Sequence, residues 1–493
     1  MYYKSTRNFE NRVTASQAIL KGIAEDGGLY VPETMPHLTF DWQLLANQSY
    51  QEVALPILQA FLPDFTTEEL QECIQGAYDE KFDDAAIAPV VSFDKQLSVL
   101  ELFHGNTIAF KDMALSILPY LMTTAAKKHG LQEEIVILTA TSGDTGKAAM
   151  AGFADVSQTR IIVFYPKDGV SQIQERQMVT QTGENTTVIG IDGNFDDAQT
   201  MVKNLFADES LKATLKARGF QFSSANSINI GRLVPQVVYY VYAYAQLVKQ
   251  GRIIAGNKVN FAVPTGNFGN ILAGYYAKQL GVPIGRLICA SNANNVLVDF
   301  FNQGIYDKNR PFFVTTSPSM DILVSSNLER LVYELVGGDT QHTAQLMQLL
   351  SQTGSYQVDA SLLSPLQQFY ANDASEAETA QAIQAVLATY HYVMDPHTAV
   401  AFSVYQKYQQ QTQDDTPTVI LSTASPYKFP RSVVSALETV SDDVSDIELI
   451  ERLQIISNIP IPEAVTSVIH APVRHQKVVA VNEMKQAVLD TLN

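Results

Sequence analysis

The stretch EIVILTATSGDTGKAAM, residues 134–150, decides the fold class. Its first five residues are rich in β-branched and aliphatic side chains and predict a strand. A loop of hydroxyl-bearing residues and glycine follows, and a helix is expected from about Gly146. A strand, a small-residue loop and a helix in this order are typical of a parallel sheet covered by helices.

The same alternation recurs along much of the chain. Further strands are expected over residues 98–102, 160–165, 187–191, 258–263, 287–290 and 418–421. Helices are expected over residues 112–129 and from the loop after 263 to residue 280. We therefore predict an α/β fold with parallel sheets flanked by helices, whose ligands bind at the carboxyl ends of the strands.

The regions outside this alternation suggest further units. Residues 1–95 have helical spacing over 15–24, 49–62 and 66–80, and they are expected to form an N-terminal accessory domain. Residues 96–493 are expected to form a catalytic region of two α/β lobes. A helical elaboration near 327–415, rich in Gln and Ala, is expected within it. An acidic stretch after residue 440 predicts a solvated helix face.

The composition limits the classes of partner. Of 493 residues 46% are apolar and 17% charged, which permits a sizeable core and excludes wholesale disorder. Asp and Glu outnumber Lys and Arg by 51 to 33, and the net charge is -18. This excess argues against nucleic acid or an anionic membrane as the main partner. A small-molecule substrate is expected instead, and a monomer and a homodimer both remain open.

The rest of the composition points to a reducing, aqueous setting. Cys73 and Cys289 are far apart and belong to no CxxC pattern, so neither a disulfide framework nor a zinc cluster is expected. The first 13 residues contain no apolar segment typical of a secretory signal. The eight histidines show no metal-ligand spacing, and we expect no catalytic metal. A cytoplasmic protein is the expectation.

Two loops after predicted strands could bind anions. In residues 139–146, hydroxyls and glycines precede a new helix, whose free N–H groups favour an anion. A P-loop would need glycine where Thr141 stands and Ser or Thr where Ala148 stands, so a nucleotide site is not supported. Residues 264–270, PTGNFGN, form the second loop, which lacks the GxGxxG spacing of a dinucleotide site. The first loop could also be an ordinary capped turn between a strand and a helix.

Lys111 is a candidate nucleophile. It follows an apolar run and precedes a predicted helix. A lysine among apolar neighbours can lose its proton and form a Schiff base. Taken alone, it could equally be a surface lysine at a helix start.

Taken together, the motifs resemble those of threonine synthases, pyridoxal-phosphate enzymes of the tryptophan-synthase-β fold. The resemblance covers most of the chain, and residues 2–32 together with SPSMDILVSSNLERL (317–331) indicate the longer form of the enzyme. The other matching segments are FHGNTIAFKDMA (103–114), TATSGDTGKAA (139–149), FSSANSINIGRLVPQ (222–236), VPTGNFGN (263–270) and LSTASPYKF (421–429).

The resemblance implies roles for particular residues. Lys111 would form the Schiff base with pyridoxal phosphate and act as the catalytic base. The other cofactor-binding residues would be Gly266, Asn267, Phe268, Gly269 and Asn270 around the phosphate, with Thr423 facing the pyridine nitrogen. The substrate-binding residues would be Ser142, Gly143, Asp144 and Thr145, with Thr141 in the same loop. Because the implied substrate has two anionic ends, we expect Arg232 or Lys147 to meet the second end.

The implied reaction converts O-phospho-L-homoserine and water to L-threonine and phosphate, the last step of threonine biosynthesis. Two positions depart from the family pattern: Asn106 stands where proline is usual, and Ser425 where histidine is frequent. Another enzyme of the same fold, such as a dehydratase or a threonine-synthase-like protein with a different phosphorylated substrate, stays open. A non-catalytic binding protein is the alternative of a different class.

Overall fold

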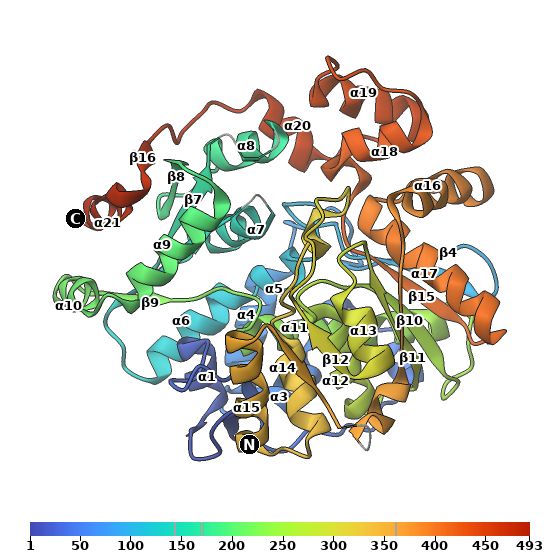
Figure 1. Ribbon diagram of the computed structural model, residues 1–493, viewed down its shortest axis with the longest axis horizontal. Coiled ribbons are helices and arrows are strands. Elements are labelled where there is room, and N and C mark those ends of the chain that lie inside the picture. The colour runs from blue at the N-terminus through green and yellow to red at the C-terminus, as the bar shows by residue number, and fades with distance from the viewer. Residues whose placement is uncertain (142–143, 168, 171, 360–361) are drawn as a thin grey trace.

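Two sheets flanked by helices dominate the computed structural model, which describes residues 1–141, 144–167, 169–170, 172–359 and 362–493 (Figure 1). The larger sheet has the strand order β14-β11-β10-β15-β5-β4 and is parallel except for the β4/β5 pair. In this order its strands are Phe369–Asp373, Ile284–Ser291, Val259–Pro264, Thr418–Ser422, Leu97–Glu101 and Val90–Ser92. The predicted parallel α/β architecture is confirmed.

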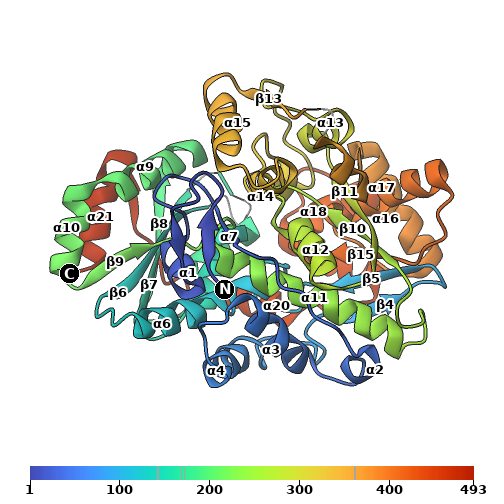
Figure 2. The same cartoon turned by 90° about the horizontal axis from the view of Figure 1, so that it is seen from below.

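The smaller sheet lies in a second lobe beside the first (Figure 2). Its five strands have the order β16-β8-β7-β6-β9, and every pair is parallel. In this order they are Val478–Ala480, Thr186–Asp192, Thr159–Pro166, Glu134–Ala140 and Phe220–Ser223. Helices α7 (Asp144–Phe153), α8 (Gln172–Val179), α9 (Phe195–Ala207), α10 (Glu209–Ala217) and α21 (Met484–Thr491) belong to this lobe.

The N-terminal residues form a three-stranded antiparallel sheet and four helices. The strands are β1 (Tyr3–Ser5), β2 (Arg12–Val13) and β3 (Tyr30–Pro32). The helices are α1 (Ala15–Lys21), α2 (Trp42–Leu45), α3 (Tyr50–Phe61) and α4 (Thr67–Ala77). Ser49 and Thr66 each cap a helix and close a capping box with the glutamate three residues later. These caps explain why both helices begin where the sequence pattern predicts.

Helix α11 (Ile230–Lys249) crosses the middle of the molecule (Figure 2). It packs against α3 and against α12 (Gly269–Leu280), and 17 of its 20 residues are buried. It contains the apolar stretch 233–248, whose side chains are therefore buried in the interior of the protein. Over the described ranges of the chain, no helix is both long and apolar enough to cross a membrane.

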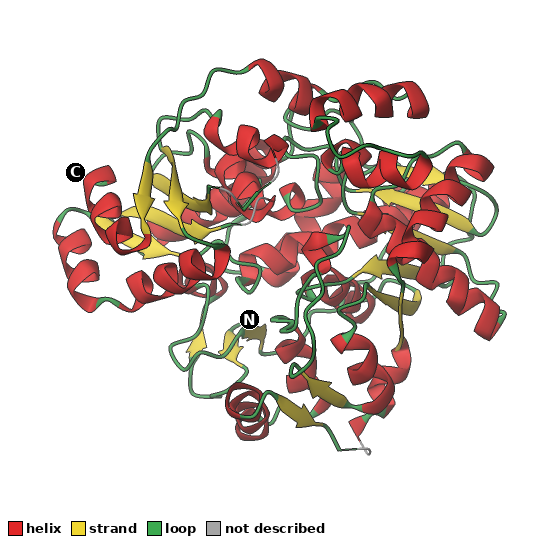
Figure 3. Cartoon of the chain, turned by 45° about the horizontal axis from the view of Figure 1, so that its top comes forward, coloured by secondary structure: helices red, strands yellow, loops and turns green. Residues whose placement is uncertain are grey.

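The remaining elements complete the fold, in which helices surround the strands of both sheets (Figure 3). They include α13 (Val296–Gln303), β12 (Ile305–Asp307), α14 (Leu328–Leu335), α15 (Thr340–Gln352), β13 (Ser355–Gln357), α16 (Glu376–Tyr390) and α17 (Pro396–Thr412). After α18 (Pro430–Leu437) and α19 (Asp446–Ser457), helix α20 (Glu463–His470) leads the chain to β16 in the smaller sheet. The C-terminal segment therefore spans both lobes.

Two of the helical predictions differ from the structure. The single helix expected over 112–129 is wrong, because the structure has α5 (Asp112–Leu115) and α6 (Leu118–Lys128). Pro119 lies in the first turn of α6, where its missing N–H costs nothing. The stretch 327–415 contains helices α14 to α17, but it also contains β13 and β14, and β14 pairs in parallel with β11.

Candidate active site

Lys111 lies at the carboxyl edge of the larger sheet, immediately before α5. Its Nζ donates to Ser319 Oγ at 3.3 Å. The preceding residue, Phe110, donates its N–H to the carbonyl oxygen of Thr423 at 2.8 Å. Thr423 follows β15 and is buried. The structure thus brings Lys111 and Thr423, more than 300 residues apart in sequence, to one place.

The loop after β10 forms the opposite wall of this place. A Cβ atom on Gly266 would lie only 2.7 Å from the carbonyl oxygen of Ser319, so glycine is required there. Phe268 adopts a left-handed conformation with φ 66° immediately before α12. The first backbone bond of that helix runs from Leu272 N–H to Phe268 O, which leaves the N–H groups of the first turn for an anion.

Asn270 is the polar side chain of the first turn of α12. It is 6% exposed, and its Oδ1 accepts hydrogen bonds from the hydroxyls of Tyr239 (2.7 Å) and Tyr240 (2.9 Å). These bonds fix the orientation of the amide. Its buried Nδ2 has no partner among the described residues, so it is available to a ligand oxygen.

Ser319 is held from a third element by a buried pair that the sequence pattern did not reveal. The Ser319 N–H donates to His397 Nε2 at 3.1 Å. Because Nε2 accepts, Nδ1 carries the proton and donates to Asp395 Oδ1 at 2.8 Å. Asp395 is fully buried and caps α17. The sequence Asp-Pro-His at a helix start was the available signal, since aspartate before proline is a strong cap pattern.

A second missed group, residues 325–330, clamps the 266–270 loop from outside. Ser325 Oγ donates to Gly266 O at 2.7 Å, and Asn327 donates to Asn267 O from both its backbone N–H and its side chain, each at 3.0 Å. Only the wider resemblance of residues 317–331 to a family segment hinted at a role for this group.

Arg330 belongs to the same clamp and is completely buried. Its guanidinium donates to Tyr30 O at 2.9 Å, to Ile228 O at 2.6 Å and to Asn327 Oδ1. The clamp on the loop is therefore anchored in the N-terminal sheet and at the entry to α11.

The predicted substrate loop is described in part. Thr141 is buried and its Oγ1 accepts from Gly146 N–H at 3.0 Å, so it caps the start of α7. Asp144 begins this helix and Thr145, which is partly buried, continues it. Ser142, Gly143 and the side chain of Asp144 lie outside the described residues.

Two buried cations lie on helices that start near the site. Arg232 is 3% exposed, Nη1 donates to Ala225 O at 2.7 Å, and Nε has no partner among the described residues. Burial lowers the pKa of Arg232 to about 10. Lys147 Nζ donates to Gln181 Oε1 at 2.5 Å, and burial, together with the nearby charge of Lys428, lowers its pKa to about 8. Burial disfavours the charged form of each side chain, and a bound anion would stabilise that form. Both cations are therefore suited to bind an anion.

The His104-Gly-Asn106-Thr segment before Lys111 is fixed by ion pairs. His104 lies between Asp83 (2.6 Å) and Glu101 (2.9 Å). Burial alone would lower the pKa of His104, but hydrogen bonds to these two carboxylates raise it to about 9. Asn106 is exposed, and Ser425 Oγ accepts from Tyr427 N–H at 3.3 Å. Both positions that depart from the family pattern are thus compatible with local turns.

Three protein-family models match the chain and together cover most of it. The model "Threonine synthase N terminus" matches residues 2–78, "Pyridoxal-phosphate dependent enzyme" matches 95–362, and "Threonine synthase, C-terminal" matches 398–487. The chain belongs to the threonine synthase family of pyridoxal-phosphate-dependent enzymes. The resemblance drawn from the motifs is confirmed, as is pyridoxal phosphate as the cofactor.

Relatives of this family match over most of the chain. Threonine synthase of Schizosaccharomyces pombe is 37% identical, and the match covers 89% of this chain and 90% of that protein. Human threonine synthase-like 1 is 41% identical over 87% of this chain, but the match spans only 59% of that longer protein. The solved structure of pyridoxal-phosphate-bound threonine synthase from Brucella melitensis has a TM-score of 0.89 and 36% identity, with complete coverage of both chains.

Proposed function

We propose that this protein is a threonine synthase, which converts O-phospho-L-homoserine and water to L-threonine and phosphate. The observation that carries the proposal is the convergence of Lys111, the 266–270 loop and Thr423 at one carboxyl edge of the sheet of a threonine synthase family member. A carbon–oxygen lyase acting on a phosphate ester needs a base, an anion site and an electron sink at one place.

The residues present fit the cofactor. Its phosphate would be held by the N–H groups that begin α12 and by Asn270 Nδ2, which is buried and otherwise without a partner among the described residues. Gly266 leaves the space that a side chain would fill, and Asn267, Phe268 and Gly269 complete the loop. Lys111 would carry the cofactor covalently. When bound, pyridoxal phosphate supplies a sink for the electrons left on Cα of an amino acid.

Thr423 is assigned to the pyridine nitrogen. A neutral hydroxyl there, unlike a carboxylate, does not keep that nitrogen protonated, which moderates the electron sink. This choice favours elimination and replacement over transamination. The backbone bond from Phe110 to Thr423 keeps this position in register with Lys111.

The proton transfers fall to Lys111. Its amine is within hydrogen-bond reach of the Ser319 hydroxyl, so Ser319 orients it, and His397 in turn holds the Ser319 backbone. An amine held in this way can remove the Cα proton, pass it on, and then remove a proton from Cβ as phosphate leaves Cγ. A proton must then add to Cγ, which becomes the methyl group, water adds its hydroxyl at Cβ, and a proton returns to Cα.

The substrate has a carboxylate and a phosphate. We assign one end to the loop 141–145, comprising Thr141, Ser142, Gly143, Asp144 and Thr145 at the start of α7, and the other end to Arg232. The free Nε of Arg232 and its low exposure support this assignment. Lys147, buried one turn into α7, is the alternative cation.

The proposal extends to organisation and location. Residues 1–95 would form the accessory domain and 96–493 the catalytic region. The enzyme would act in the cytoplasm, an assignment supported by its two buried free cysteines and its acidic composition. It would be a monomer or a homodimer. It would need no nucleic-acid or membrane partner.

Mass spectrometry of the borohydride-reduced protein tests the cofactor assignment. The expected result is pyridoxal phosphate attached to Lys111, and attachment elsewhere would overturn the assignment. Incubation with O-phospho-L-homoserine should then release phosphate and threonine in equal amounts. Release of phosphate with a keto acid, or activity only on another phosphorylated substrate, would instead support the dehydratase or threonine-synthase-like alternatives.

A further inference from the structure

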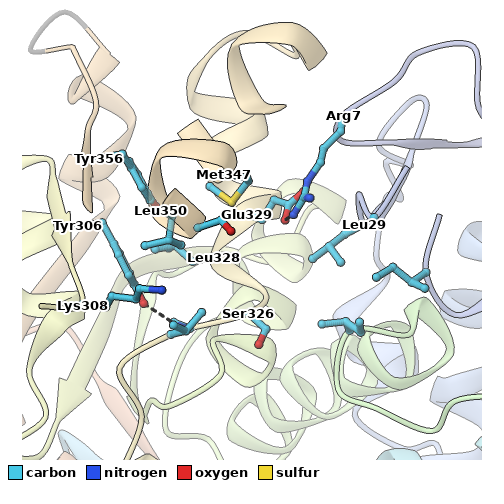
Figure 4. A pocket seen from close by; sticks show the side chains of 16 residues that line it. Arg7, Leu29, Tyr306, Lys308, Ser326, Leu328, Glu329, Met347, Leu350 and Tyr356 are labelled. Atoms are coloured by element: carbon cyan, nitrogen blue, oxygen red, sulfur yellow. Dashed lines mark hydrogen bonds and ion pairs between the residues drawn. The ribbon is translucent and has the colours of Figure 1, made fainter. Parts of the chain in front are cut away.

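A cavity of about 330 Å³ lies where the N-terminal residues meet α14 and α15 (Figure 4). Its volume is within the range of about 300–1,000 Å³ that is typical of small-molecule sites. None of the residues assigned to cofactor or substrate lines it. It is therefore a separate place, at a junction of the kind where ligand sites often occur.

The walls of this cavity are mostly apolar. Leu29, Leu328, Met347, Leu350 and Tyr356 are among the lining residues. Figure 4 places Met347 and Leu350 above the cavity, Leu29 on one side and Tyr356 on the other. A ligand that fits such walls needs an apolar body.

The charges at the cavity favour a monoanion. Arg7 donates to both carboxylate oxygens of Glu329, from Nε at 2.9 Å and from Nη2 at 2.7 Å, so these two charges cancel. Lys308 lines the opposite side and has no ion-pair partner among the residues that the structure describes. One unbalanced positive charge remains, and the polar residue Ser326 also lines the wall. One surplus charge matches a carboxylate better than a phosphate dianion.

We propose that this cavity binds a small monocarboxylate with an apolar body, and that the bound ligand tightens cofactor binding through the 266–270 loop. This inference rests on the proposed role of that loop in holding the cofactor phosphate.

Two hydrogen bonds connect the cavity to the 266–270 loop. Tyr306, which lines the cavity and stacks on Tyr356 with a centroid distance of 5.4 Å, accepts from Ser325 N–H at 2.7 Å. Ser325 Oγ donates to Gly266 O at 2.7 Å. A ligand that packs against Tyr306 and residues 325–329 restricts this segment, so the loop that it clamps is more ordered before the cofactor arrives.

The first experiment measures binding to the apo-protein, so it does not depend on the cofactor. Hexanoate and cyclohexanecarboxylate are titrated by thermal shift beside their neutral amides. We expect a saturable rise in Tm with the acids and little with the amides. The rise should vanish in Lys308→Gln, which removes the charge, and in Leu350→Trp, which fills the cavity. Equal shifts from acid and amide, no shift from either acid, or a shift that persists in both variants would overturn the site.

The second experiment measures the Kd of pyridoxal phosphate with and without a saturating acid. We expect the acid to lower this Kd about fivefold or more, in the range of ordinary coupling between sites. In Ser325→Ala the acid should still raise Tm but no longer change the Kd. An unchanged Kd in the wild type, with binding of the acid intact, would overturn the coupling. Failure of the proposed function would differ, because Asn270→Ala would then leave the Kd measured without acid unaffected.

Discussion

Replacing Arg232 with methionine should make the substrate-free protein more stable and the enzyme less effective. The guanidinium is almost fully buried and Nε has no partner among the described residues. Burial lowers its pKa from 12.5 to about 10, and this difference corresponds to about 3 kcal/mol of cost for holding the charge in the fold. The hydrogen bond from Arg232 to Ala225 O stabilises the folded state by about 1.5 kcal/mol. The net gain expected on replacement is therefore about 1–2 kcal/mol.

Urea unfolding in the absence of substrate measures the first effect, and steady-state kinetics measures the second. Removing a charge-assisted hydrogen bond to an anionic substrate should cost about 1.5–3 kcal/mol, or roughly 10- to 150-fold in kcat/KM. Arg232→Lys is the matched control, because it keeps the charge and should retain part of the activity without the gain in stability.

Two results would refute this reasoning. If Arg232→Met lowers the unfolding midpoint, the guanidinium stabilises the fold through its bond to Ala225, and its burial is then not a sign of ligand binding. If the midpoint rises but kcat/KM stays unchanged, the substrate anion binds elsewhere, and Lys147 becomes the candidate to replace next.

Three further predictions concern the surroundings of Lys111. A Cβ atom on Gly152 would lie 2.1 Å from the backbone oxygen of Leu115, so Gly152→Ala should push α7 off α5 and lower stability by about 1–3 kcal/mol, measured by urea unfolding; an unchanged midpoint would contradict this contact. His104 has a pKa raised to about 9, so its contribution is complete below its unfolded pKa of about 6.5 and is lost as the pH rises through 9. The difference in unfolding midpoint between wild type and His104→Gln should therefore shrink over that window, and a constant difference would count against the ion pairs. His397→Phe leaves the Ser319 N–H without its acceptor and should lower kcat roughly tenfold or more, whereas His397→Gln, which can accept, should retain more activity; equal losses in the two variants would argue against this role.

The parts of the fold that local rules determine were predictable. Strand β6 follows from its run of β-branched and aliphatic residues, and the starts of α3 and α4 follow from the caps Ser49 and Thr66. Strand β14 was missed because its residues, FYAND, carry no alternating pattern and lie among Gln- and Ala-rich helices. It is a strand because β11 offers an open edge, which is a tertiary cause.

The candidate site divides in the same way. Lys111 and the 264–270 loop stand at strand or helix ends, where a sequence pattern with a resemblance can find them. The contacts of Ser319 with His397, and of Arg330 with the N-terminal sheet, join segments 78 and 300 residues apart. Such pairings depend on how the helices pack, and no local rule in the sequence specifies them. Pro119, in the first turn of α6, was a local signal for the break between α5 and α6, and the prediction of one helix over 112–129 did not use it.

The net charge of -18 does not oppose the binding of a phosphorylated substrate. The reason is that surface charges are screened by the solvent, whereas charges inside the site act on the substrate at short range. At physiological ionic strength, charges more than about 8 Å apart across solvent are largely screened, so the acidic surface contributes little inside the site. Three buried cations lie in or next to the proposed site, namely Lys147, Arg232 and Lys428, which is close enough to Lys147 to lower its pKa. Around an anion they are screened far less than surface charges, and they need no rearrangement to meet it. The acidic total keeps the outside of the protein solvated, and under the proposed function a few buried cations and helix N–H groups would determine what the site binds.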